Sequence, residues 1–111
     1  MTALADRECQ AMPTGTPALD ADQAARLLQE IPGWNITANN TVLQREFRFQ
    51  NYYQTMAFVN AVAWIAHRTD HHPDLTVGYN RCTVSYSTHS IGGLSDNDFI
   101  CAARIDRLGQ L

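Results

Sequence analysis

Apolar residues recur along most of the chain at spacings typical of helices and strands. Apolar positions at i, i+3, i+4 and i+7 predict a first helix over about 20–31, which Pro32-Gly33 ends. A second, longer helix is predicted over about 52–70, where the apolar positions form an unusually broad surface. A third is predicted over about 96–108, because apolar residues again fall on one stripe.

Alternation of apolar and polar residues predicts four strands in two hairpins. The first hairpin turns at Asn39-Asn40, residues that tolerate the left-handed dihedrals of a tight turn. The second turns near Asn80, and its last strand, over about 82–89, has one apolar face and one hydroxyl-rich face that carries His89. Arg45 is the one charged residue on the apolar side of its strand.

The order helix, hairpin, helix, hairpin, helix predicts an α+β fold. The economical arrangement is a four-stranded antiparallel sheet with three helices packed on one face, which leaves the hydroxyl-rich face open for a ligand or a neighbour. Residues 1–18 show no period and are expected to form a flexible N-terminal head, with residues 19–111 as the single domain. The broad apolar surface of the second helix favours packing against another subunit over deep burial in the monomer.

Charge and cysteine usage narrow the class of protein. Eight Lys and Arg residues against eleven Asp and Glu residues give a net charge of -3, with no basic cluster, which argues against direct nucleic-acid binding. The sequence shows no secretory start and no apolar run long enough for a membrane span, so we expect a cytoplasmic protein. Cys9, Cys82 and Cys101 lack metal or redox spacing and are expected to be reduced, as small core residues or spectators.

The candidate chemistry lies in four histidines between positions 67 and 89. Pro73 excludes helical dihedrals at His72, so the second helix should end there and leave His71 and His72 at its C-terminus. The partial negative charge of that helix end favours the imidazolium form, which suits a proton donor. His67 and His71 stand four residues apart and would share a helical face, which is a two-histidine metal spacing. Two alternatives to a metal pair are surface histidines at a frayed helix end and an acid/base site completed by His89, which we favour.

Two further residues have both a structural and a functional interpretation. Asp98 lies three residues after Ser95, so it could simply accept a hydrogen bond in the first turn of the third helix. Trp34 could pack in the core, or its indole could flank a flat heterocycle.

The identity and spacing of several residues resemble the signature of the pterin-4a-carbinolamine dehydratase family, over about residues 19–109. These residues are His67, His71-His72-Pro73, Tyr79, His89 and Asp98. The resemblance implies the same α+β fold, a homo-oligomer (dimer or tetramer), and neither a metal nor an organic cofactor. It also implies the reaction, which is dehydration of a 4a-hydroxytetrahydropterin to the quinonoid dihydropterin. This step recycles the pterin cofactor of an aromatic amino acid hydroxylase.

The resemblance further implies the site residues. The catalytic residues would be His71, His72 and His89. The substrate-binding residues would be Asp70, His71, His72, Trp34, Ser87, Thr88, His89, Ser90 and Asp98. Our hypothesis is that His72 protonates the leaving oxygen and that His71 or His89 handles the proton on N5. Ser90 replaces an acidic residue common in relatives, which leaves the preferred pterin side chain open.

Two alternative functions come with the resemblance. Animal relatives also act as dimerisation partners of a homeodomain transcription factor, through the surface of the second helix, so this chain could be a protein-binding coactivator. A relative acting in molybdopterin metabolism would keep the same fold.

Overall fold

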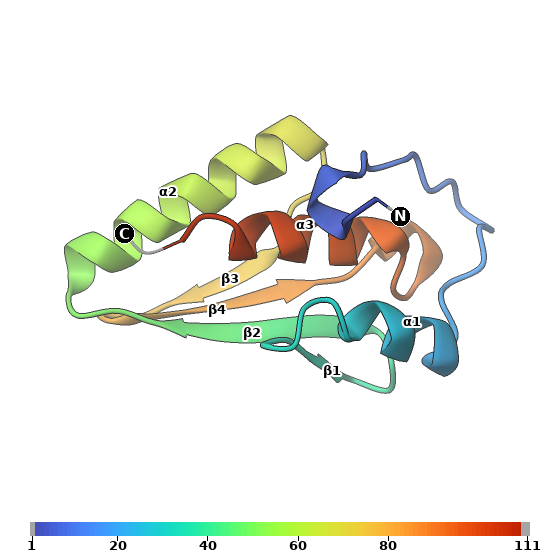
Figure 1. The fold of residues 1–111 in the computed structure, drawn as a ribbon, viewed down its shortest axis with the longest axis horizontal. Helices are drawn as coiled ribbons and strands as arrows, with labels where there is room; N and C mark the ends of the chain where they lie inside the picture. Colours follow the sequence, from blue (N-terminus) through green and yellow to red (C-terminus); the bar gives the residue numbers. More distant parts are fainter. Residues whose placement is uncertain (1, 110–111) are drawn as a thin grey trace.

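The fold is described here from a computed structural model. It covers residues 2–109 and contains one four-stranded antiparallel sheet with three helices on one face (Figure 1). The predicted α+β class and the order of its elements are therefore confirmed. In chain order the elements are α1 (Ala21–Leu28), β1 (Asn35–Thr37), β2 (Val42–Arg48), α2 (Tyr52–Thr69), β3 (Asp74–Val77), β4 (Arg81–Tyr86) and α3 (Asp96–Asp106).

The sheet has the strand order β1-β2-β4-β3, so the two predicted hairpins join through β2 and β4. In β4 the alternate residues Cys82, Val84 and Tyr86 are fully buried, and the hydroxyl residues between them are only partly buried. This alternation matches the predicted apolar and hydroxyl-rich faces. The core lies between the buried face and the helices, because side chains from α2 and α3 complete it.

Local sequence signals explain where the helices begin. At α1, Asp20 accepts a hydrogen bond from the Gln23 main-chain N–H, and the Gln23 side chain accepts one from the Asp20 N–H, which is a full capping box. The helix ends at Leu28, and the predicted continuation to residue 31 is instead a tight turn with i to i+3 hydrogen bonds. Such turns commonly finish a helix because they satisfy its last carbonyl groups.

The last strand is shorter than predicted. β4 ends at Tyr86, and His89 begins a short 3-10 turn, His89–Ile91, so His89 does not lie on the hydroxyl-rich face of the sheet. Thr88 pairs with Gly93 across this turn, so the chain folds back before α3. Alternation of residue types continues past the point where the sheet partner ends, which is why the pattern overestimated the strand.

Arg45 is accommodated on the apolar side by a residue far away in the sequence. Its guanidinium lies 4.5 Å from the ring centroid of Phe47 and pairs with Asp106 at the end of α3 at 2.9 Å. The carboxylate of Asp106 also accepts the indole N–H of Trp34, at 3.0 and 3.1 Å. One carboxylate thus satisfies two donors that would otherwise be left at the edge of the core.

The start of the N-terminal head lies against α3 through Leu4–Asp6, and the rest of the described head, up to residue 18, runs on to α1 (Figure 1). Leu4 is buried, and Arg7 forms an ion pair with Asp96 at 2.6 Å. Gln10 and Asn97 exchange two hydrogen bonds through the Gln10 main chain. Apart from the burial of Leu4, these contacts are polar, and none of them follows a period, so the sequence pattern carried no sign of them. Among the described residues no helix is long and apolar enough to cross a membrane.

Candidate active site

The turn after α2 sets the direction of the first candidate histidine. Asp70 ends the helix in the left-handed conformation, with φ 53° and ψ 41°, and the main-chain N–H groups of Asp70 and His71 both donate to the Ala66 carbonyl. The helix therefore ends at Asp70, before the position at which Pro73 would exclude helical dihedrals. The expectation that His67 and His71 share a helical face was wrong, because His71 lies beyond the helix and its side chain turns back toward α3.

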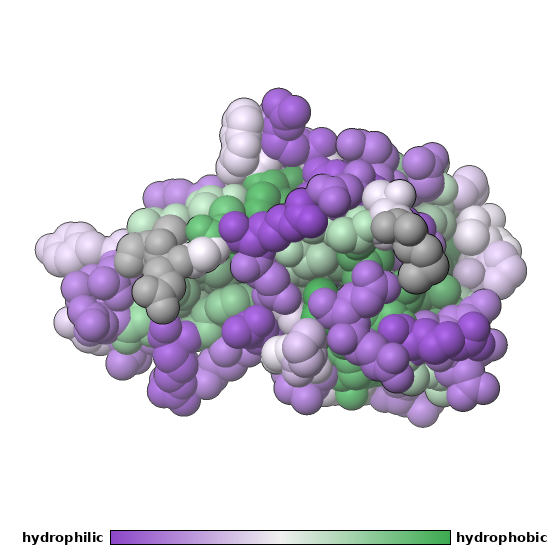
Figure 2. All heavy atoms as spheres, in the orientation of Figure 1, coloured by the Kyte–Doolittle hydropathy of each residue, from purple (hydrophilic) through white to green (hydrophobic). Residues whose placement is uncertain are grey.

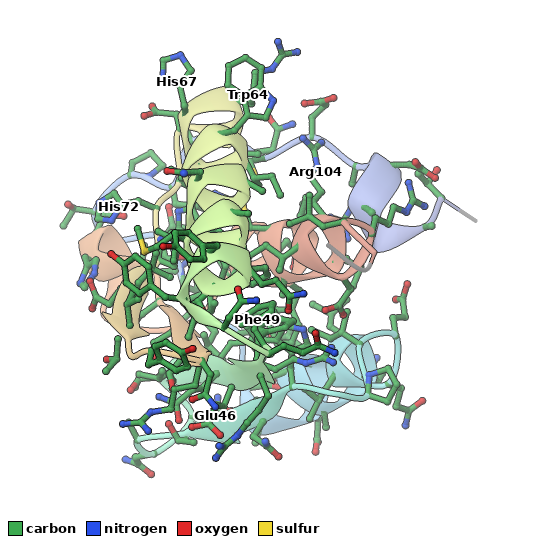
Figure 3. All side chains as sticks on the ribbon, turned by 90° about the vertical axis from the view of Figure 1, so that its left-hand side faces the viewer. Glu46, Phe49, Trp64, His67, His72 and Arg104 are labelled. Carbon is green, nitrogen blue, oxygen red and sulfur yellow. The ribbon has the colours of Figure 1, made fainter. Side chains whose placement is uncertain are left out.

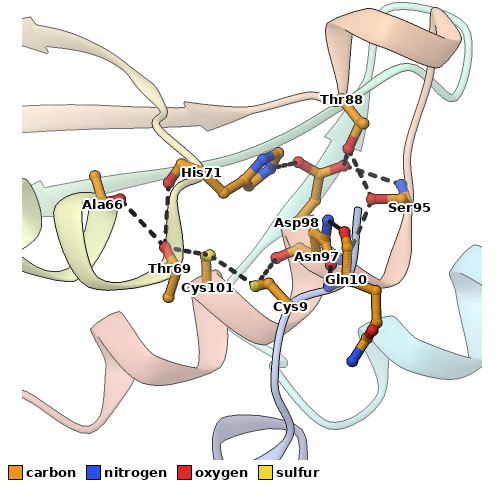
Figure 4. A network of polar contacts seen from close by, with 10 residues as sticks. All are labelled: Cys9, Gln10, Ala66, Thr69, His71, Thr88, Ser95, Asn97, Asp98 and Cys101. Carbon is orange, nitrogen blue, oxygen red and sulfur yellow. Dashed lines mark hydrogen bonds and ion pairs between the residues drawn. The ribbon is translucent and has the colours of Figure 1, made fainter. Parts of the chain in front are cut away.

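His71 forms a buried pair with Asp98. The distance from His71 Nε2 to Asp98 Oδ1 is 2.6 Å, and the Asp98 side chain has no exposed surface (Figure 4). The other carboxylate oxygen of Asp98 accepts from the Thr88 hydroxyl at 2.8 Å and from the Ser95 main-chain N–H at 3.0 Å. The capping role expected for Asp98 in α3 is confirmed. Each oxygen has its own task, since one caps the helix and the other holds the imidazole.

The surroundings of His71 favour its charged form. Burial alone would lower the pKa of His71, but the hydrogen bond and the negative charge of Asp98 outweigh this and raise the pKa above its ordinary value of 6.5. The ring also stacks on Tyr86, with centroids 5.6 Å apart and planes within 8°. The pair with Asp98 favours the charged form, and stacking on Tyr86 fixes the plane of this imidazole.

His72 and His89 form a second, exposed pair. Their ring centroids are 6.4 Å apart and the planes differ by 26°, so the two imidazoles face each other across the turn after α2 and the turn after β4. His67 is directed elsewhere, since it stacks on Trp64 near the end of α2 and points away from His72 (Figure 3). The structure thus pairs His72 with His89, places the neighbouring His71 on Asp98 and leaves His67 apart from both.

A pocket of about 350 Å³ adjoins these histidines. It is lined by Thr69, Asp70, His71, Thr88, Ser90, Asn97 and four head residues, Cys9 to Met12. His72 and His89 do not line it, but each is the chain neighbour of a lining residue, His71 and Ser90 respectively. Ser90 donates its hydroxyl hydrogen to the Met12 carbonyl at 2.6 Å. A predicted substrate-binding residue therefore holds the head in place as one wall of the pocket.

The remaining expected site residues have different positions. Asp70 is exposed at the helix end, Ser87 is half-buried and Thr88 is buried. Trp34 is only 2% exposed and packs against Phe47 and Tyr86, so its surroundings are those expected of a residue that packs in the core. Its contribution to a ligand site stays a prediction.

Another groove, of about 510 Å³, lies between β2, the start of α2 and the end of α3. Its two arginines are already paired, Arg45 with Asp106 and Arg48 with Glu46. It contains no histidine, so we place the candidate chemistry at the smaller pocket. Within residues 2–109 no group of three or more His, Cys, Asp or Glu side chains is arranged to hold a metal ion.

Sequence reasoning missed several residues around the site. Tyr86 was read only as part of an apolar strand face, yet it supports the His71 ring. Asn97 and the head residues showed no motif or period. A polar residue in the first turn of a helix is usually explained by capping, so Asn97 gave no separate signal.

The pair between His71 and Asp98 makes a prediction about stability and pH. Because the pKa of His71 is higher in the folded than in the unfolded chain, the pair stabilises the fold fully below the unfolded pKa of about 6.5 and loses this effect as the pH rises through the folded pKa. The free energy of unfolding of wild type relative to His71→Gln should therefore be larger at about pH 6 than at about pH 9. Urea unfolding at both pH values measures this difference. A difference that is equal or larger at the higher pH would contradict the ion pair. In an Asp98→Asn background the difference should no longer be larger at about pH 6, because burial alone lowers the pKa of His71.

The comparisons with a family model and with similar sequences agree on one family. The family model described as pterin 4 alpha carbinolamine dehydratase matches residues 17–108. A relative from Nitrosospira multiformis that bears the name pterin-4-alpha-carbinolamine dehydratase is 56% identical over 108 residues, which cover 97% of this chain and 94% of the relative. One of the same name from Nitrosomonas eutropha is 57% identical over 106 residues, covering 95% and 92% of the two chains.

Two solved structures are also similar. A protein from Brucella melitensis described as a transcriptional coactivator/pterin dehydratase superposes with a TM-score of 0.78 at 26% identity, covering 82% of this chain and 97% of that one. A pterin dehydratase-like protein described as a RuBisCO assembly factor in the alpha-carboxysome gives a TM-score of 0.62 at 27% identity, covering 71% and 93%.

Proposed function

Since the chain belongs to the pterin-4-alpha-carbinolamine dehydratase family, we propose that it removes water from a 4a-hydroxytetrahydropterin to give the quinonoid dihydropterin. The observation that carries this proposal is the arrangement of three histidines: His71 lines the pocket and is held by a buried carboxylate, and His72, the next residue in the chain, faces His89.

The reaction needs an acid and a base on neighbouring atoms. Hydroxide leaves C4a once its oxygen receives a proton, and the new double bond between C4a and N5 forms as N5 loses its proton, so one water is released. The lone pair on N5 assists departure of the oxygen. Each positioned acid or base contributes roughly 100- to 10,000-fold, so histidines suffice for this step.

The environment of His71 supports a division of roles. Asp98 raises the pKa of His71, which favours a charged, orienting role at the pocket wall over the role of a base. We therefore assign removal of the N5 proton to His89 and protonation of the leaving oxygen to His72, which follows the negative end of α2. His71 would orient the pterin. The chain around Asp70 and from Ser87 to Ser90 would supply the remaining polar contacts to the pterin. Trp34 would support the ring of Tyr86, on which His71 stacks.

The cellular role is part of the same proposal. A dehydratase of this kind would recycle the pterin cofactor of an aromatic amino acid hydroxylase in the cytoplasm, without a metal or an organic cofactor of its own. A homodimer or homotetramer is supported by the exposed aromatic residues of α2 and of the β3 hairpin, of which Trp64 is 61% and Tyr53 82% exposed. Figure 2 shows a hydrophobic area along α2, besides other hydrophobic areas on the same face.

A direct assay tests the proposed reaction. Generating 4a-hydroxytetrahydropterin in the presence and absence of the protein and following the ultraviolet change of dehydration should show catalysis well above the spontaneous rate. Prior dialysis of the protein against a chelator should leave the rate unchanged, because the proposed mechanism transfers protons through histidines and uses no metal. Dehydration at the spontaneous rate would refute the proposal, and a rate restored only by added metal would refute the metal-free mechanism.

A binding role is the second candidate, favoured by the same exposed α2 aromatics and by the coactivator and assembly-factor descriptions of the two similar structures. The assay separates the two candidates. A protein that only binds a partner would give no dehydration, and its histidines could be replaced without effect on that binding.

A further inference from the structure

Two cysteines meet where the N-terminal head crosses α3. The Sγ atoms of Cys9 and Cys101 are 3.7 Å apart, although the residues are 92 positions apart in the sequence (Figure 4). Cys101 is buried and also contacts the Thr69 hydroxyl at 3.5 Å, whereas Cys9 is half-buried and lines the pocket beside His71. The Cys9 thiol is therefore reachable from solvent through the pocket, and the buried Cys101 thiol lies in contact with it.

The surroundings make the two thiols unequal. The hydrogen bond with Cys101 lowers the pKa of Cys9 to about 7 against the opposing effect of partial burial, and the positive charges of His71 and Arg104 act in the same direction. The same hydrogen bond, together with burial, raises the pKa of Cys101. Cys82 offers a contrast within the chain, because it is fully buried in β4 and burial raises its pKa. Thiolates and not thiols react with peroxides, so Cys9 is the group that should react first.

We propose that Cys9 and Cys101 form a peroxide-sensitive dithiol, whose oxidation to a disulfide fastens the N-terminal head to α3 beside the pocket. In the first step the Cys9 thiolate attacks one oxygen of hydrogen peroxide. An S–O bond forms, the O–O bond breaks, and the hydroxide that leaves takes up a proton to become water. In the second step Cys101 loses its proton and attacks Cys9 Sγ, so an S–S bond replaces the S–O bond and a second water departs. Peroxide gains the two electrons that the two sulfurs lose.

The fastening would act on a contact that already exists. The head is held near the pocket by the hydrogen bonds of Gln10 with Asn97 and of Ser90 with the Met12 carbonyl. These three bonds are partly buried or exposed, so they can open. A covalent link at Cys9 would keep the pocket wall closed. This proposal stands on the thiol geometry and does not depend on the dehydratase reaction.

The test uses the full-length protein and equimolar hydrogen peroxide at neutral pH. The intact mass should fall by about 2 Da, with no dimer on a non-reducing gel. Because the chain has no lysine and no arginine between Arg81 and Arg104, trypsin leaves Cys82 and Cys101 on one peptide. The digest is therefore made on the Cys82→Ala variant, where a link between peptides 8–26 and 82–104 identifies the bridge. In wild type, fragmentation of the same linked peptide should place the bridge at Cys101.

Serine variants separate the two roles. Cys101→Ser lacks the second thiol and should accumulate a Cys9 sulfenic acid that dimedone traps, whereas Cys9→Ser should yield almost no adduct. Cys9 should react at least about tenfold faster than Cys82. A bridge that involves Cys82, a dimedone adduct on Cys101 in the Cys9→Ser variant, or an unchanged mass after peroxide treatment would each overturn the proposal.

Discussion

Replacing His72 or His89 by alanine is expected to lower kcat for dehydration by about 100- to 10,000-fold while the protein stays folded. Both imidazoles are exposed and face each other, so their removal leaves no cavity in the core. Each substitution would remove a group that transfers a proton in the same step. The double variant should therefore lose little more activity than the less active of the two single variants. The assay is the ultraviolet change of dehydration, with circular dichroism to check the fold.

His67→Ala is the matched control for this prediction. It deletes the same kind of side chain from the same exposed surface, but His67 stacks on Trp64 and points away from His72 (Figure 3). Its rate should stay near that of wild type. If His72→Ala and His89→Ala lose no more activity than His67→Ala, these two histidines do not catalyse the reaction.

Replacing Asp98 by asparagine is expected to lower the free energy of unfolding by about 3–5 kcal/mol, because it removes one partner of a buried ion pair. The cost is large for a domain whose total stability is on the order of 5–15 kcal/mol. An amide also brings a donor toward the Thr88 hydroxyl and the Ser95 N–H, which now donate to the carboxylate. Urea unfolding at about pH 6, where His71 is charged, measures this loss.

Asp96→Asn provides the comparison for Asp98. Both carboxylates lie in the first turn of α3, but Asp96 is half-exposed and pairs with Arg7 at the surface, so its loss should cost no more than about 1 kcal/mol. A positioning role for Asp98 makes a further demand. The pH profile of kcat should shift in Asp98→Asn, because the cause of the raised pKa of His71 is gone. Equal stability losses in the two variants, or an unshifted profile, would contradict the role given to this pair.

The sequence alone predicted the class of fold and most of its elements. Capping residues at Asp20 and Ser95 and the Asn39-Asn40 turn act over a few positions, so their effects can be read from neighbouring residues. Errors arose at the ends of elements. The end of α2 near residue 70 was predicted correctly, but its left-handed Asp70, in a conformation that Asp adopts only occasionally, turns His71 off the helical face expected for it.

The identities of the candidate histidines were also available from their spacing, but their different environments were not. His71 meets Asp98 and Tyr86, His72 meets His89, and the head meets α3. All these contacts join segments that are far apart in the chain. Periodicity records which side of an element is buried, because a helix or strand repeats every few residues. Which imidazole receives a carboxylate and which thiol meets another depends on how the finished elements pack, and only the tertiary structure decides that.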